Sequence, residues 1–138
     1  MQETPTVTVL RLGHRPGRDE RMTTHVGLTA RALGADRLLL EPRAADRART
    51  VTEVTERFGG PFEVDQVATP EQLLADWSGR VVHLTMYGLG LQNVESEIRS
   101  AHAGEEALLV VVGAEKVPFT VYEHADWNVA VTNQPHSE

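Results

Sequence analysis

The sequence has no cysteine among its 138 residues, which excludes disulfide bonds and thiolate metal sites. It has no apolar run near the roughly 18 residues that a membrane-spanning helix needs. Its first residues carry neither the basic nor the long apolar segment of a secretory signal. The six histidines show no H-x-x-x-H spacing, which is typical of zinc ligands on a helix. We therefore expect a cytoplasmic protein with no metal and no membrane partner.

Positive charge is scarce overall and is concentrated in the first part of the chain. The formal net charge is -7, which argues against a globally basic nucleic-acid binder. Residues 1–57 hold 10 of the 13 basic residues and 8 acidic ones, a net charge of +2. Residues 58–138 hold 3 basic and 12 acidic residues, a net charge of -9. Only the first part is therefore suited by its charge to meet a polyanion.

Apolar segments of strand length alternate with helical patterns along the whole chain. We expect strands at Thr6–Leu12, Arg37–Glu41, Phe62–Val67, Arg80–Tyr87, Ala107–Val112 and Trp127–Val131. We expect helices from a Thr23 or Thr24 cap to Gly34, and at Ala44–Phe58, Thr69–Trp77, Leu91–Ala101 and Phe119–His124. This alternation predicts a single α/β domain over residues 1–138, with a mostly parallel sheet and helices on both faces.

Polar or glycine-containing segments lie at the ends of three expected strands, at Val81–Gly88, Gly113–Pro118 and Asn133–Glu138. Parallel sheets bind ligands beyond the carboxyl ends of their strands, so the pattern predicts one crevice for a small ligand. No phosphate-binding loop and no G-x-G-x-x-G follow the first strand, which disfavours standard nucleotide sites. Alternatively, Gly113–Pro118 is an ordinary turn and Asn133–Glu138 a helix start. A Ser-His-Glu hydrolase is disfavoured because adjacent side chains cannot align as a triad.

Four arginines, Arg11, Arg15, Arg18 and Arg21, recur every three or four residues around His14. They form either an RNA-binding face, with His14 included, or a solvated face in which acidic residues are interspersed. Arg31 differs, because it lies in a mostly apolar helical stretch. A partly buried arginine costs desolvation unless it is paired, so Arg31 is either salt-bridged or directed at an anion.

Six segments of the chain resemble the archaeal tRNA (cytidine(56)-2′-O)-methyltransferases, which belong to the SPOUT class of knotted methyltransferases. They are Leu10–Pro16, Thr23–Val26, Val82–Gly88, Val112–Pro118, Ala125–Ala130 and Asn133–Glu138. The resemblance implies S-adenosylmethionine as methyl donor, a C-terminal trefoil knot and a homodimer. It also implies tRNA as partner, with the ribose 2′-hydroxyl of T-loop cytidine 56 as the acceptor.

The resemblance also assigns roles to residues. Arg31 matches an arginine implicated in activating the hydroxyl, and His25, one turn away on the same helix, is a second catalytic candidate. Because arginine stays cationic at any working pH, we expect Arg31 to stabilise a developing alkoxide rather than to accept the proton. The implied cofactor pocket comprises Leu84, Gly113, Ala114, Glu115, Lys116, Val117, Val131, Thr132, Asn133, Gln134, Pro135, His136, Ser137 and Glu138.

The sequence ends at Glu138, whereas the resemblance implies a further helix that closes the knot. We therefore expect either that this sequence is a fragment or that the domain lacks the family's final helix, in which case the pocket wall, the knot and the dimer are incomplete. The alternative function left open at this point is a non-catalytic α/β module that binds a nucleoside or RNA.

Overall fold

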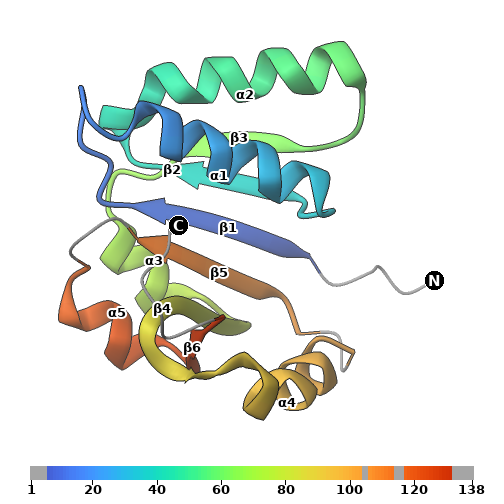
Figure 1. Cartoon of the computed structure of the whole chain (residues 1–138), viewed down its shortest axis with the longest axis vertical. Coiled ribbons are helices and arrows are strands. Elements are labelled where there is room, and N and C mark those ends of the chain that lie inside the picture. Colours follow the sequence, from blue (N-terminus) through green and yellow to red (C-terminus); the bar gives the residue numbers. More distant parts are fainter. Residues whose placement is uncertain (1–5, 104–105, 114–116, 132–138) are drawn as a thin grey trace.

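The computed structural model describes residues 6–103, 106–113 and 117–131. Its centre is a six-stranded parallel sheet with strand order β3-β2-β1-β5-β4-β6 (Figure 1). The strands are β1 (Val7–Leu12), β2 (Arg37–Leu40), β3 (Glu63–Gln66), β4 (Arg80–Gly90), β5 (Leu108–Gly113) and β6 (Trp127–Ala130). The helices are α1 (Glu20–Ala32), α2 (Ala45–Phe58), α3 (Pro70–Asp76), α4 (Leu91–Ala103) and α5 (Phe119–His124), and a 3-10 turn, Pro42–Ala44, precedes α2.

Helices cover both faces of the sheet because its central strands are apolar on both sides. Successive residues of a strand point to opposite faces. Val9 of β1 accordingly packs with α1 and α2, whereas Leu10 and Leu12 pack with α3 and α5. Gly27 lets α1 pack closely against β2 and α2, since a Cβ at this position would lie 2.8 Å from side-chain atoms of Leu38 and Val51. The predicted α/β architecture with helices on both faces is confirmed.

Two expected boundaries differ from the structure by three or more residues. Neither Thr23 nor Thr24 caps α1, because the helix already begins at Glu20, and the Thr23 side chain is fully buried in its first turn. Strand β4 continues past Tyr87 to Gly90, because an irregularity in its pairing with β6 lets the strand resume. The expected knot and missing final helix concern residues that lie outside the described part of the chain. Within that part, no helix combines the length and apolar character needed to cross a membrane.

Candidate functional site

The carboxyl ends of four neighbouring strands meet at one edge of the sheet. Leu12 of β1 pairs with Gly113 of β5, and Leu84 of β4 lies opposite Val112 of β5 and Val129 of β6. Val131 directly follows β6 and is 63% exposed. The fold therefore brings the predicted cofactor residues Leu84, Gly113 and Val131 to the same edge, although they are far apart in sequence.

The side chain of Val117 packs against Gly113, which precedes it by four positions in the sequence. A Cβ at position 113 would overlap Cγ2 of Val117, so a larger residue fits only if the Val117 side chain or the backbone shifts. Val117 in turn packs against the core cluster that contains Leu12 and Val121. Gly113 and Val117 therefore lie against each other, and the core holds Val117 in place. The other predicted cofactor residues, Ala114 to Lys116 and Thr132 to Glu138, lie outside the described residues.

Strand β4 is irregular where it reaches this edge. Both Leu84 and Leu89 lie opposite Val129, so the residues between them leave the regular ladder. Gly88 approaches the β6 backbone so closely that a Cβ would overlap the carbonyl of Asn128. Tyr87, inside the irregularity, is 78% exposed. Such bulges often lie beside functional sites because they redirect side chains.

A buried polar group that the sequence analysis did not assign lies beside Leu84. His83 is buried, with Nδ1 2.9 Å from Oδ1 of Asn128, and its ring makes an edge contact with Tyr122 at 4.7 Å between centroids. Burial lowers the pKa of His83, and the hydrogen bond to Asn128 offsets this in part. A neutral ring donates its Nδ1 proton to the amide oxygen. In the sequence, the only sign of this cluster is a histidine within the apolar segment Val81–Leu84.

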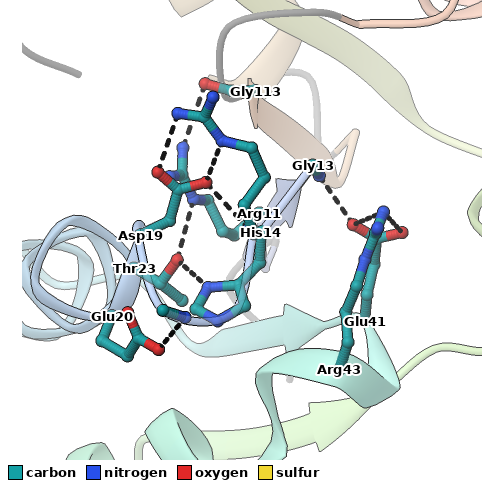
Figure 2. Close-up of polar contacts among 11 residues, drawn as sticks. Arg11, Gly13, His14, Asp19, Glu20, Thr23, Glu41, Arg43 and Gly113 are labelled. Carbon is teal, nitrogen blue, oxygen red and sulfur yellow. Dashed lines mark hydrogen bonds and ion pairs between the residues drawn. The ribbon is translucent and has the colours of Figure 1, made fainter.

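A second buried cluster joins β1, α1 and β5 (Figure 2). Arg11 is fully buried; its Nε donates to Oγ1 of Thr23 at 3.2 Å, and its Nη1 donates to the Gly113 carbonyl at 3.0 Å. Nδ1 of His14 lies 2.6 Å from the same Thr23 hydroxyl. Burial is the main cause that lowers the pKa of His14, so we infer that the Thr23 hydroxyl donates to a neutral ring.

The predicted RNA-binding residues do not form one exposed face. Arg18 and Arg21 are exposed, and the half-exposed Arg15 binds Asp19 through its backbone nitrogen, Nε and Nη2, at 2.8, 2.9 and 3.1 Å. The Arg15 side chain is the main cause that lowers the pKa of Asp19 to about 2. Arg11 and His14 are buried, contrary to the expected surface position, because β1 directs Arg11 beneath α1.

The catalytic candidates lie elsewhere. Arg31, in the last turn of α1, donates from Nη2 to the carbonyl of Gly59 at 2.6 Å. Five residues after Arg31, the backbone nitrogen of Asp36 donates to the carbonyl of Val7, the first residue of β1. Arg31 therefore lies near the amino end of the sheet. His25 is exposed and precedes Arg31 by six positions, roughly 9 Å along the axis and on a different face, rather than by one turn. Within a single copy of the protein, Arg31 and Gly113 therefore lie at opposite ends of the sheet.

A cavity of about 370 Å³ opens at the carboxyl edge, on the face covered by α3 and α5. Leu12, Gly13 and Pro118 line it beside the Gly113 segment, and Arg43 and Glu71 add charge at its wall. Glu41 accepts from the Gly13 backbone nitrogen at 2.6 Å and from Arg43 at 3.3 Å (Figure 2). Within the described residues, no group of three or more His, Asp or Glu side chains is placed to hold a metal ion.

Sequence comparisons identify close relatives. A family model described as "tRNA ribose 2'-O-methyltransferase, aTrm56" matches residues 58–138. A tRNA (cytidine(56)-2′-O)-methyltransferase of Haloarcula marismortui is 67% identical over 138 residues, which is 100% of this chain and 76% of the relative. The protein of that name from Natronomonas pharaonis is 66% identical over 132 residues, covering 96% of this chain and 73% of its own length.

Solved structures share the fold at low sequence identity. A protein of the TrmH family of RNA methyltransferases from Porphyromonas gingivalis aligns with 99% of this chain at a TM-score of 0.67 and 14% identity. The SpoU methyltransferase AviRb from Streptomyces viridochromogenes, solved with AdoMet, aligns with 100% of it at a TM-score of 0.59 and 13% identity. The chain spans about half of each structure, 52% and 55%. Both support the predicted fold class.

Proposed function

The chain belongs to the aTrm56 family of tRNA ribose 2′-O-methyltransferases, and from this we propose that it methylates the ribose 2′-hydroxyl of cytidine 56 in tRNA, with S-adenosylmethionine as donor. The observation that carries the proposal is 67% identity over all 138 residues to a relative named for this reaction. The partner is then tRNA and the location the cytoplasm, where tRNA is found.

The proposed cofactor site is the carboxyl edge at Leu84, Gly113, Val117 and Val131, completed by Ala114 to Lys116 and Thr132 to Glu138. The chemistry of the described residues suits the group. Leu84, Val117 and Val131 offer apolar surface to an adenine ring, and parallel sheets bind ligands at this edge. The net charge of -9 over residues 58–138 favours a ligand that carries a sulfonium cation.

S-adenosylmethionine supplies an electrophilic methyl group at this edge. The protein must then place the 2′-oxygen in line with that carbon at roughly 3–3.5 Å, and it must stabilise the charge that develops as the hydroxyl loses its proton. A guanidinium is suited to the second task, since it donates hydrogen bonds and keeps its charge. We assign this role to Arg31, with His25 as the second candidate.

Because Arg31 and Gly113 lie at opposite ends of one sheet, we propose that Arg31 acts on the site of a second copy in a homodimer. Exposed apolar side chains occur at both ends and support such a contact. Leu33 and Phe58, 82% and 71% exposed, lie near Arg31, whereas Tyr87 and Leu89, 78% and 63% exposed, lie near the carboxyl edge. A two-fold symmetric dimer would make each contact twice.

The reaction is tested with an unmodified tRNA transcript and S-adenosylmethionine, followed by mass spectrometry of nuclease fragments. The expected product is one additional methyl group on the fragment that contains cytidine 56. A transcript with 2′-deoxycytidine at that position is the matched control and must stay unmethylated. Binding of S-adenosylmethionine without transfer to any tRNA would instead support a non-catalytic binding module.

The dimer is tested by mixing two inactive variants, Arg31→Ala and Gly113→Ala. If each site combines Arg31 of one copy with Gly113 of the other, a mixed dimer contains one intact site. Statistical mixing then restores about a quarter of the wild-type activity. If both residues serve the same copy, no mixed dimer has an intact site and the activity stays at the level of the separate variants.

A further inference from the structure

Arg11 is the largest of the fully buried side chains in the described part of the protein. A guanidinium keeps its charge at all working pH values, so burial must be offset by hydrogen-bonding partners. Arg11 donates hydrogen bonds to two other elements, to Thr23 in α1 and to Gly113 at the end of β5. The bond to Gly113 joins residues 102 positions apart. The buried charge thus ties the first strand to the far end of the fifth.

The acceptor on β5 is the carbonyl of its last residue, where the regular pairing with β1 ends. Nη1 of Arg11 donates to this carbonyl at 3.0 Å. On the other side, Val117 packs so tightly against Gly113 that a Cβ has no room. Two independent contacts, one from Arg11 and one from Val117, therefore hold Gly113 at the end of β5.

We propose that Arg11 is a positioning residue that holds Gly113, the last described residue before the proposed cofactor segment, and that it does not contact RNA. This inference rests on the proposed function, which places S-adenosylmethionine at that segment. Full burial denies Arg11 a surface for phosphate, and the Gly113 carbonyl is the group through which it acts. Thr23, which accepts from Nε of Arg11 and contacts His14, extends the same network to the loop after β1.

The test compares Arg11→Met and Arg11→Lys with the wild type, and uses Arg37→Met as the matched control. Arg37 is also a strand arginine, but it lies at the amino end of β2, and its Nε has no hydrogen-bond partner among the described residues. Affinity for S-adenosylmethionine is measured by titration calorimetry, affinity for tRNA by filter binding, and methyl transfer as separate KM and kcat values.

Arg11→Met is expected to weaken S-adenosylmethionine binding roughly tenfold to a hundredfold, the loss expected for a hydrogen bond from a charged group. The KM for the cofactor rises accordingly, while tRNA affinity changes by less than about threefold. Arg11→Lys, which keeps one charged donor, is expected to recover part of the loss. Arg37→Met should leave both affinities unchanged.

Thr23→Val provides a second variant in case Arg11→Met does not fold. It removes the hydroxyl that accepts from Nε but leaves Arg11 in place, and we expect a loss of cofactor affinity of roughly threefold to tenfold. Amide hydrogen exchange in β5 supplies a readout that needs no ligand. Exchange at the carboxyl end of β5 should accelerate in Arg11 and Thr23 variants, but not in Arg37→Met.

The outcomes separate the two proposals. A wild-type protein that neither binds S-adenosylmethionine nor methylates tRNA overturns the proposed function, while exchange in β5 still reports whether Arg11 holds Gly113. Unchanged exchange and cofactor affinity in Arg11→Met and Thr23→Val would overturn the positioning role. Loss of tRNA affinity with intact cofactor binding would instead identify Arg11 as an RNA contact.

Discussion

The two ends of the parallel sheet differ in how far their charged side chains are buried. At the carboxyl end, Arg11 is buried, and Asp19 is buried against Arg15. At the amino end, Arg80 binds Glu106 at 2.7 Å and Asp126 at 3.3 Å with its side chain 43% exposed. Water screens the second arrangement, whereas the first depends on every partner being present. We therefore expect the carboxyl end to tolerate fewer substitutions than the amino end.

The largest effect is expected for Gly113→Ala at the carboxyl end. The added Cβ overlaps a methyl group of Val117, so the Val117 side chain or the backbone of β5 must move. We expect cofactor binding to weaken by more than about a hundredfold, and the free energy of unfolding to fall by ~1–3 kcal/mol. Calorimetric titration and urea denaturation measure the two losses. Gly34→Ala, at the amino end, has no atom within 4 Å of its Cβ but strains the backbone because φ is +92°, so it should lower stability and keep normal cofactor affinity.

Asp19→Asn should destabilise the protein by ~1–3 kcal/mol, because it removes a buried charged acceptor of the Arg15 hydrogen bonds. Since the pKa of Asp19 is lowered to about 2, its carboxylate stabilises the fold above the unfolded value of 3.8. That contribution disappears as the pH falls through 2. The stability difference between wild type and variant, measured by denaturant unfolding, should therefore shrink between pH 4 and pH 2. A constant difference would contradict this origin.

The sequence predicted the elements well because strand and helix periodicities are local properties. The expected surface position of Arg11 was wrong, because the four arginines spaced three or four residues apart belong to a strand, a loop and the start of a helix rather than to one helix. Arg11 belongs to β1, where a period of two decides which side is buried. The contact of Gly113 with Val117, the irregularity of β4 and the distance from Arg31 to Gly113 depend on tertiary packing, which no local pattern encodes.

We expect the two buried histidines, His14 and His83, to make the free energy of unfolding depend on pH. Burial lowers the pKa values of His14 and His83 from 6.5, so the folded state binds fewer protons than the unfolded state as the pH falls below 6.5. The free energy of unfolding should therefore decrease, by at most ~1.4 kcal/mol per pH unit for each ring. Urea unfolding of wild type and His83→Gln between pH 7.5 and pH 5.5 should show a shallower slope for the variant. Parallel slopes would exclude His83 as a source.

The smallest effect is expected for Arg80→Met at the amino end. Its two ion pairs are partly exposed, and water screens such pairs so that they contribute little to stability. The measurement is the midpoint of urea unfolding at low and high salt, with Asp19→Asn as the carboxyl-end counterpart. A loss for Arg80→Met as large as that for Asp19→Asn would remove the contrast between the two ends.

The strand order also has a consequence for how the protein is made. Strand β1 lies at the centre of the sheet between β2, its near neighbour in sequence, and β5, which is synthesised about a hundred residues later. Contacts between residues so distant in sequence slow folding. During synthesis, β1, β2 and β3 can pair early, but the Arg11 side chain must wait for Gly113. In the nascent chain, the hydrogen bond from Arg11 to Gly113 can therefore form only after most of the sequence has been synthesised.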